Sequence, residues 1–396
     1  MKRQRDTLPA VLCSAAILCS GRAATDNKHL SPHISSPSNP VASSPENNPT
    51  KEVVLGIVVG SCALGVLAAF IVLPWIFCCH SKKKDEKGHN RNSDHYLVSI
   101  GGCDLGFDME GLLRASAEVL GKGTSGTTYK AALEGSAATV EVKRLNDVCV
   151  GREEFHLQME VSGSIRHENV APLKAYYYSE DEKLTVQDYY SQGSVSAMLH
   201  ANRGENQFPL DWETRVRIAI GAARGIAYIH GANLVHGNIK SSNVFLNSRQ
   251  YGCVSDFGLA TLVSSVAPTL ARTTGYRAPE FLDTWKTTQA SDVYSFGVLL
   301  FELLTGKSPL HSACEDEVDD LVRWVCSIVS EEWSGEVFDV ELLKYPNIEE
   351  EMVEMLQVGM ACAARMPEQR PKMADVVKMV EGIRNQPSTG EVQHQI

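Results

Sequence analysis

An uncharged apolar run from Val53 to Cys79 constrains this 396-residue chain more than any other feature of its sequence. The run is long enough to cross a bilayer as one helix, whereas a buried core helix is usually shorter. A basic cluster, KKKDEK, begins at Lys82. Because lysine and arginine collect on the cytoplasmic side, we expect a transmembrane helix at 53–79, with Lys51 outside the cell and the later residues in the cytosol. A buried core helix is the alternative interpretation.

The residues before this run predict no folded module. A basic start and a short apolar stretch predict a secretory signal peptide at 1–24, with a disordered tail as the alternative. Residues 25–52 are rich in serine and proline, which is typical of a disordered extracellular stalk. Together with the span, these features predict a single-pass protein of the plasma membrane. Residues 80–106 are expected to form a basic juxtamembrane linker.

After this linker the sequence changes from a β-rich to an α-rich pattern. Alternation near Thr139–Val142 and Leu184–Val186 predicts strands, and helical periods dominate after Trp212. The fold class that we expect is therefore α+β. A small β-rich part would occupy 107–190 and a larger α-helical part 191–384, followed by a disordered tail at 385–396.

Two helices can be placed individually. Asp211 is expected to cap a helix that ends at Gly231. Phe155 and Met159 lie one helical turn apart and predict an earlier amphipathic helix, which carries Glu160.

A glycine-rich stretch, GKGTSG, follows the apolar pair Val119-Leu120 and suggests phosphate binding. Glycines at 121, 123 and 126 let backbone amides approach phosphates. The β-prone residues Thr127 to Lys130 favour a glycine-tipped hairpin over the helix that opens a dinucleotide-binding loop. The formal net charge of −11 disfavours a nucleic-acid partner.

Further motifs follow in a fixed order: Lys143 at the end of a strand pattern, HGNIKSSN from His236, DFG from Asp256 and APE from Ala278. With the stretches FDMEGLLRASAEVLGKGTSGTTYKA and MEVSGSIRHENV, they resemble the cytosolic kinase domain of plant leucine-rich-repeat receptor-like kinases, in the group described as inactive. The resemblance covers about Phe107 to Arg384. It implies a bilobal protein-kinase fold, with a β-rich N-lobe at 107–190 and an α-helical C-lobe at 191–384, behind one transmembrane helix.

The resemblance also implies ATP and magnesium as cofactors. The residues expected to bind the nucleotide are Gly121, Gly123, Gly126, Lys143, Glu160, Asp188 and Tyr189, with Lys143 and Glu160 as an ion pair. Asn243 and Asp256 would hold the metal. The catalytic loop would contribute position 238 and Lys240. Glu280 with Arg370, and Asp292, would have structural roles.

Two departures in the catalytic loop argue against catalysis. Asn238 stands where the related kinases have an aspartate, and an amide cannot accept the proton of a substrate hydroxyl. Losing a general base costs on the order of 10²- to 10⁴-fold in rate. Gly237 replaces the arginine that would bind a phosphorylated activation loop.

Two further departures concern the adenine slot. Glu141 replaces an alanine two residues before Lys143 and would place a carboxylate in an apolar slot. Gln187 replaces a tyrosine at the gatekeeper position. These changes put ATP binding in doubt, unless Glu141 turns outward or pairs with a lysine.

Three hypotheses remain from the sequence. A membrane-anchored pseudokinase would act by binding other receptor kinases or signalling proteins. A weakly active serine/threonine kinase would depend on positioning and metal electrostatics alone. The third hypothesis is a truncated product of a receptor-kinase gene, lacking the extracellular repeats.

Overall fold

The computed structural model describes residues 97–383 except 103–104, 124, 135–137, 147, 149, 202–208, 263–274, 285, 313–317 and 332–334. The expected signal peptide, stalk, span and C-terminal tail lie outside these residues and stay predictions. Among the described helices, none combines the length and the apolar character that crossing a membrane requires.

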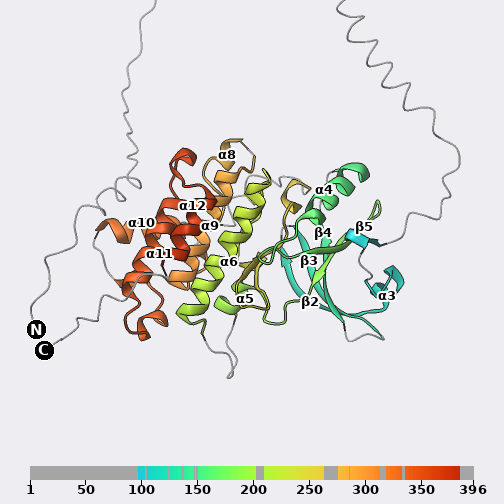
Figure 1. Ribbon diagram of the computed structural model, residues 1–396, viewed down its shortest axis with the longest axis horizontal. Helices are drawn as coiled ribbons and strands as arrows, with labels where there is room; N and C mark the ends of the chain where they lie inside the picture. Colours follow the sequence, from blue (N-terminus) through green and yellow to red (C-terminus); the bar gives the residue numbers. More distant parts are fainter. Residues whose placement is uncertain are drawn as a thin grey trace, which may run out of the picture. The chain divides into compact units, whose positions relative to one another are not determined.

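The N-terminal part is built on a six-stranded antiparallel sheet in the order β1-β5-β6-β4-β3-β2. Figure 1 shows β2, β3 and β4 side by side, with α4 beside the sheet. The strands and the short helix before them are α3 (Met109–Arg114), β2 (Ser116–Gly123), β3 (Gly126–Ala132), β4 (Thr139–Leu145), β5 (Leu173–Tyr178) and β6 (Lys183–Asp188). Both predicted strands and the glycine-tipped hairpin, β2–β3, are confirmed.

The sheet begins earlier than the linker boundary at residue 106 implied. Strand β1 (Val98–Ser99) pairs with β5, and Ile100 behind it is buried. Ile100 packs so closely on α4 that a Cβ at Gly163 would lie 2.5 Å from it. An apolar side chain with this contact gains free energy by leaving water, which explains why the end of the expected linker joins the N-lobe.

Helix α4 (Arg152–Ser164) is the amphipathic helix predicted from Phe155 and Met159, both of which are fully buried. The Phe155 ring meets Tyr176 of β5 edge to face, with centroids 6.0 Å apart. Glu160 follows Met159 by one residue, about 100° around the helix, and is exposed. The packing of the apolar face therefore turns Glu160 toward solvent.

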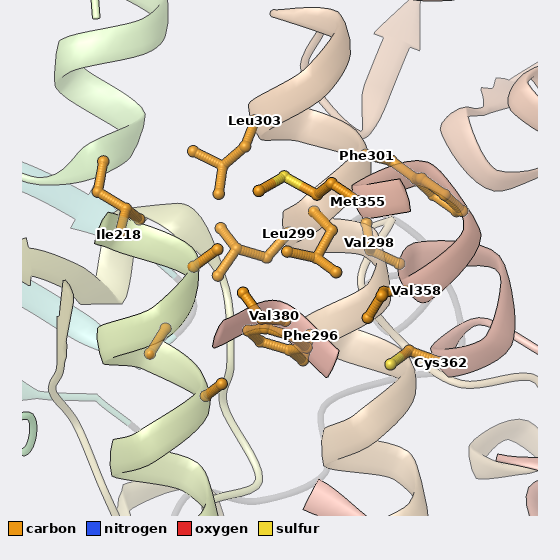
Figure 2. Packing of buried hydrophobic residues seen from close by; sticks show 14 of the residues in the cluster. Ile218, Phe296, Val298, Leu299, Phe301, Leu303, Met355, Val358, Cys362 and Val380 are labelled. Atoms are coloured by element: carbon orange, nitrogen blue, oxygen red, sulfur yellow. The ribbon is translucent and has the colours of Figure 1, made fainter. Parts of the chain in front are cut away.

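The larger part is helical and is organised around α9 (Gln289–Thr305), in which every residue from Ser291 to Thr305 except Ser295 is buried. Helix α6 (Trp212–Gly231) starts at the predicted cap, since the Asp211 carboxylate accepts a hydrogen bond from Thr214 N. Figure 2 shows Ile218 of α6, Leu299 of α9, Met355 of α11 and Val380 of α12 meeting in one apolar cluster.

The other C-lobe elements complete this part. They are α5 (Val195–His200), η2 (Ser241–Asn243), β7 (Val244–Leu246), β8 (Gly252–Val254), η3 (Leu259–Thr261), α8 (Phe281–Thr284), β9 (Leu310–Ser312), β10 (Val318–Asp320), α10 (Leu321–Glu331), η4 (Gly335–Val337), η5 (Leu342–Lys344), α11 (Glu349–Cys362), η6 (Pro367–Gln369) and α12 (Met373–Gly382). The predicted change from a β-rich to an α-rich part is confirmed.

Two contacts fix the frame of the site. A Cβ at Gly221 of α6 would lie 2.3 Å from Gly252 N, so only glycine lets the α6 backbone lie directly against β8. Strand β8 leads straight to Asp256. At the other end, the Arg370 guanidinium binds Glu280 through Nη1 at 2.6 Å and Nη2 at 2.8 Å, which confirms the expected ion pair.

Candidate functional site

A cavity of about 350 Å³ lies beneath the β2–β3 hairpin. Because side chains alternate along a strand, Glu141 and Lys143 of β4 point to the same face. Their partners in β6 are Gln187 and Thr185. Both β4 side chains line the cavity, together with Gly121, Gly123, Gly126, Tyr189, Lys240, Asn243 and Asp256.

The Glu141 carboxylate lies inside this cavity. The residue is only 5% exposed, and its Oε1 accepts a hydrogen bond from Gln187 Nε2 at 2.8 Å. Burial raises the pKa of Glu141 to about 7; the nearby Asp256 charge adds to this, while the Gln187 hydrogen bond and Lys143 oppose it. The alternative that Glu141 turns outward is therefore wrong.

Lys143 reaches the Asp256 carboxylate, and both side chains are largely buried, with 11% and 4% exposed. The expected partner of Lys143 was Glu160, but Glu160 is exposed on α4 and Lys143 ends at Asp256 instead. The burial of Phe155 and Met159 sets this rotation of α4. Asp256 has a φ of 64°, a left-handed backbone rarely adopted by an aspartate.

The buried carboxylate of Asp292 holds the backbone of the catalytic loop by hydrogen bonds. Its Oδ2 accepts hydrogen bonds from His236 N at 2.7 Å and His230 Nε2 at 3.0 Å, and its Oδ1 accepts one from Gly237 N at 2.8 Å. The expected structural role of Asp292 is confirmed. Gly237 has a φ of +76° and a Cβ there would lie 3.0 Å from the Ala260 Cβ, so this backbone suits glycine and would strain a larger residue.

Asn238 stands in this loop as a half-buried amide that cannot titrate. The backbone carbonyl oxygen of Asn238 accepts a hydrogen bond from Asn243 Nδ2 at 3.0 Å. The Asn243 amide is thereby oriented, and its Oδ1 remains the atom that can bind a hard metal ion. Asn243 and Asp256 are the described residues best suited to that task.

The cavity gathers most of the predicted residues but not all of them. Asp188 lies away from the lining and pairs with Lys174 at 2.5 Å, in the exposed region of the sheet. Sequence reasoning missed Phe245, which lines the cavity and stacks on Tyr190 with ring centroids 4.9 Å apart. The sequence feature that could have identified Phe245 is its position two residues after Asn243.

The lining fits a nucleotide at one end and not at the other. Glycine amides, Lys143, Asn243 and Asp256 provide the donors and oxygen ligands that phosphates and magnesium use. At the other end, the buried Glu141 carboxylate stands where an uncharged base ring would need an apolar surface. The lining therefore combines groups suited to binding phosphate and metal with one buried carboxylate, Glu141.

Comparison with known proteins matches this architecture. The family model of protein tyrosine and serine/threonine kinases matches residues 115–380. A protein of Arabidopsis thaliana named as a probable inactive receptor kinase is 55% identical over 359 residues, which cover 84% of this chain and 56% of the relative. The chain thus spans little more than half the length of this relative.

Two solved structures are similar. The pseudokinase domain of BIR2, an immune regulator of the RLK/Pelle family, has a TM-score of 0.61 and 31% identity, covering 74% of this chain and 91% of that domain. The kinase domain of maize SIRK1, solved with bound AMP-PNP, has a TM-score of 0.65 and 33% identity, covering 72% and 99%. The expected resemblance to plant leucine-rich-repeat receptor kinases named as inactive is confirmed. The chain has the bilobal protein-kinase fold and belongs to the protein tyrosine and serine/threonine kinase family, with plant receptor kinases as its relatives.

Proposed function

We propose that this protein is a membrane-anchored pseudokinase that signals by binding other proteins rather than by transferring phosphate. The observation that carries the proposal is the pair of changes at the two ends of the site. Asn238 removes the general base, and Glu141 fills the base-binding end with a buried carboxylate. Either change alone weakens catalysis. The loss of the general base affects proton transfer, and the buried carboxylate affects nucleotide binding.

The anchor in this proposal is the apolar run from Val53 to Cys79, with the kinase domain on the cytosolic side of the plasma membrane. The basic cluster that begins at Lys82 supports this orientation. The partners would be other receptor kinases or signalling proteins, a class in keeping with the names of the relatives.

A weak serine/threonine kinase is the second candidate, and one observation favours it. Lys143, Asn243 and Asp256 all line one cavity, and phosphoryl transfer depends mainly on positioning and on neutralising charge. In that case magnesium-dependent autophosphorylation would be measurable despite Asn238.

Measuring the melting temperature while ATP is titrated tests the part of the proposal that concerns nucleotide binding. A ligand that binds only the folded state raises the melting temperature as its concentration rises. For the full chain in detergent micelles, we expect ATP to leave the melting temperature unchanged, with or without magnesium. A clear magnesium-dependent rise would support the weak kinase and contradict occlusion by Glu141.

A further inference from the structure

A second, smaller cavity of about 30 Å³ lies between the catalytic loop and the residues that precede α8. Its lining includes Gly237, Asn238, Lys240, Arg277 and Asp292. Lys240 also lines the larger cavity, so the two spaces adjoin each other at this side chain.

Two cations, Lys240 and Arg277, line this small cavity. Neither Lys240 nor Arg277 forms a hydrogen bond or an ion pair with any residue in the described part of the chain. The Arg277 guanidinium lies over the Phe281 ring, 4.4 Å from its centroid, which leaves the N–H groups at its edges free. Burial lowers the pKa of both cations. The charges of Lys143 and Arg277 lower the pKa of Lys240 further, whereas Asp256 raises it, and Asp292 raises the pKa of Arg277.

The nearby carboxylates are already engaged. Asp292 accepts hydrogen bonds from His230, His236 and Gly237, and Asp256 contacts Lys143. An aspartate at position 238 would supply one more negative charge beside the two cations. Because Asn238 is neutral, the cavity keeps a surplus positive charge in a desolvated place, where an anion gains most from it.

We propose that Lys240, Arg277 and Asn238 form a binding site for a phosphate monoester dianion, namely a phosphorylated serine or threonine side chain of a partner protein. A phosphomonoester carries a charge of about −1.5 to −2 at pH 7 and has three acceptor oxygens. The two outer N–H groups of the Arg277 guanidinium match two of these oxygens, and Lys240 adds a positive charge. The Asn238 side-chain amide can donate a hydrogen bond to the phosphate, whereas an aspartate there would repel it.

This inference deepens the proposed function, on which it rests. A kinase that works on hydroxyl groups needs a base at position 238, whereas a protein that binds phosphorylated partners benefits from a neutral donor there. Inorganic phosphate and the terminal phosphate of a nucleotide share the same chemistry, so the experiment must separate these sources from a phosphorylated side chain.

The experiment measures fluorescence anisotropy of a labelled peptide with one phosphoserine, titrated with the full chain in detergent micelles without nucleotide or magnesium. We expect the unphosphorylated twin to bind at least about 10-fold more weakly, because a charge-assisted hydrogen bond contributes that much or more. Inorganic phosphate should compete, but at higher concentration than the phosphopeptide.

Variants identify the site. Arg277→Gln and Lys240→Gln should each weaken phosphopeptide binding by about 10-fold. Asn238→Asp, which restores a carboxylate, should weaken it as well. Arg323→Gln is the matched control, since Arg323 is an exposed arginine on α10 and its loss removes the same charge.

Three results would overturn the inference: equal binding of the two peptides, inorganic phosphate binding as tightly as the phosphopeptide, or Arg323→Gln weakening binding as much as Arg277→Gln. If Arg277→Gln does not fold, phosphopeptide binding by the Lys240→Gln and Asn238→Asp variants tests the inference instead. Because nucleotide and magnesium are absent, failure of peptide binding leaves the proposed loss of catalysis untouched. Phosphate transfer by the chain would contradict the proposed function, and with it the basis of this inference, and a separate assay measures it.

Discussion

Gln187 Nε2 donates a hydrogen bond to Glu141 Oε1 at 2.8 Å, across the neighbouring strands β6 and β4. The two residues are direct partners in the antiparallel register, so their side chains lie on the same face of the sheet. This face lines the large cavity. The hydrogen bond holds a carboxylate in the slot instead of allowing it to turn toward solvent.

The buried Glu141 predicts an unusual dependence of stability on pH. Its pKa is about 7 in the folded protein against an ordinary value of 4.5, so the folded state holds more protons between these two pH values. Stability from this group is therefore present below about pH 4.5, falls as pH rises to about 7 and stays lost above it. We expect Glu141→Gln to stabilise the protein at pH 8 by up to about 3 kcal/mol, and to change little at pH 4.5.

Denaturant unfolding followed by tryptophan fluorescence at the two pH values measures this difference. Glu118→Gln is the control, because the Glu118 side chain is 72% exposed on the same sheet. A stabilisation by Glu141→Gln of the same size at both pH values would contradict the assignment.

The same carboxylate predicts how nucleotide binding can be restored. Glu141→Ala removes the charge from the slot and leaves Lys143, Asn243 and Asp256 in place. We expect the melting temperature of this variant to rise with ATP concentration in the presence of magnesium, unlike that of the unmodified chain. Glu118→Ala should behave as the unmodified chain does. If ATP shifts all three proteins equally, Glu141 does not control the slot.

The fold was largely predictable because its signals are local. Alternation marked β4 and β6, Asp211 marked the start of α6, and the glycines marked the β2–β3 hairpin. Strand β1 was missed because its two residues are placed by pairing with β5 and by Ile100 packing against Gly163, and no local pattern reveals either contact.

The sequence predicted which residues form the site better than it predicted which of their side chains pair. The positions of Lys143, Asn243 and Asp256 followed from motif order, and all three line one cavity. The pairing of Lys143 with Glu160 failed because it depends on the rotation of α4, which tertiary packing of Phe155 sets. The burial of Glu141 was undecided in the sequence because it depends on a cross-strand partner, Gln187.

The ion pair between Arg370 and Glu280 predicts a large loss of stability when it is broken. The Arg370 side chain is fully buried and that of Glu280 is 20% exposed, so Arg370→Leu leaves a mostly buried carboxylate without its partner. We expect Arg370→Leu to destabilise the protein by about 3–5 kcal/mol. Arg249→Leu, which breaks an exposed pair with Glu168, should cost at most about 1 kcal/mol. Equal losses in denaturant unfolding would mean that burial does not decide the strength of the pair.

The proposed orientation in the membrane predicts protection from external protease. In sealed vesicles with the cytosolic side enclosed, the domain from Phe107 to Arg384 should stay intact, because the basic residues after Cys79 hold it inside. Detergent should then expose it to digestion, which serves as the control. Cleavage of the domain in intact vesicles would reverse the proposed topology.

Transfer of radiolabelled phosphate from magnesium-ATP, to the chain itself and to a generic basic protein, tests the central claim most directly. We expect the unmodified chain to give no more label than Asp256→Asn, which lacks the metal carboxylate. Asn238→Asp alone should gain little, and Asn238→Asp combined with Glu141→Ala should gain about 10²-fold, the contribution of a positioned base. Transfer by the unmodified chain at an ordinary kinase rate of about 1–100 s⁻¹, abolished by Asp256→Asn, would contradict the claim that this protein acts without catalysis.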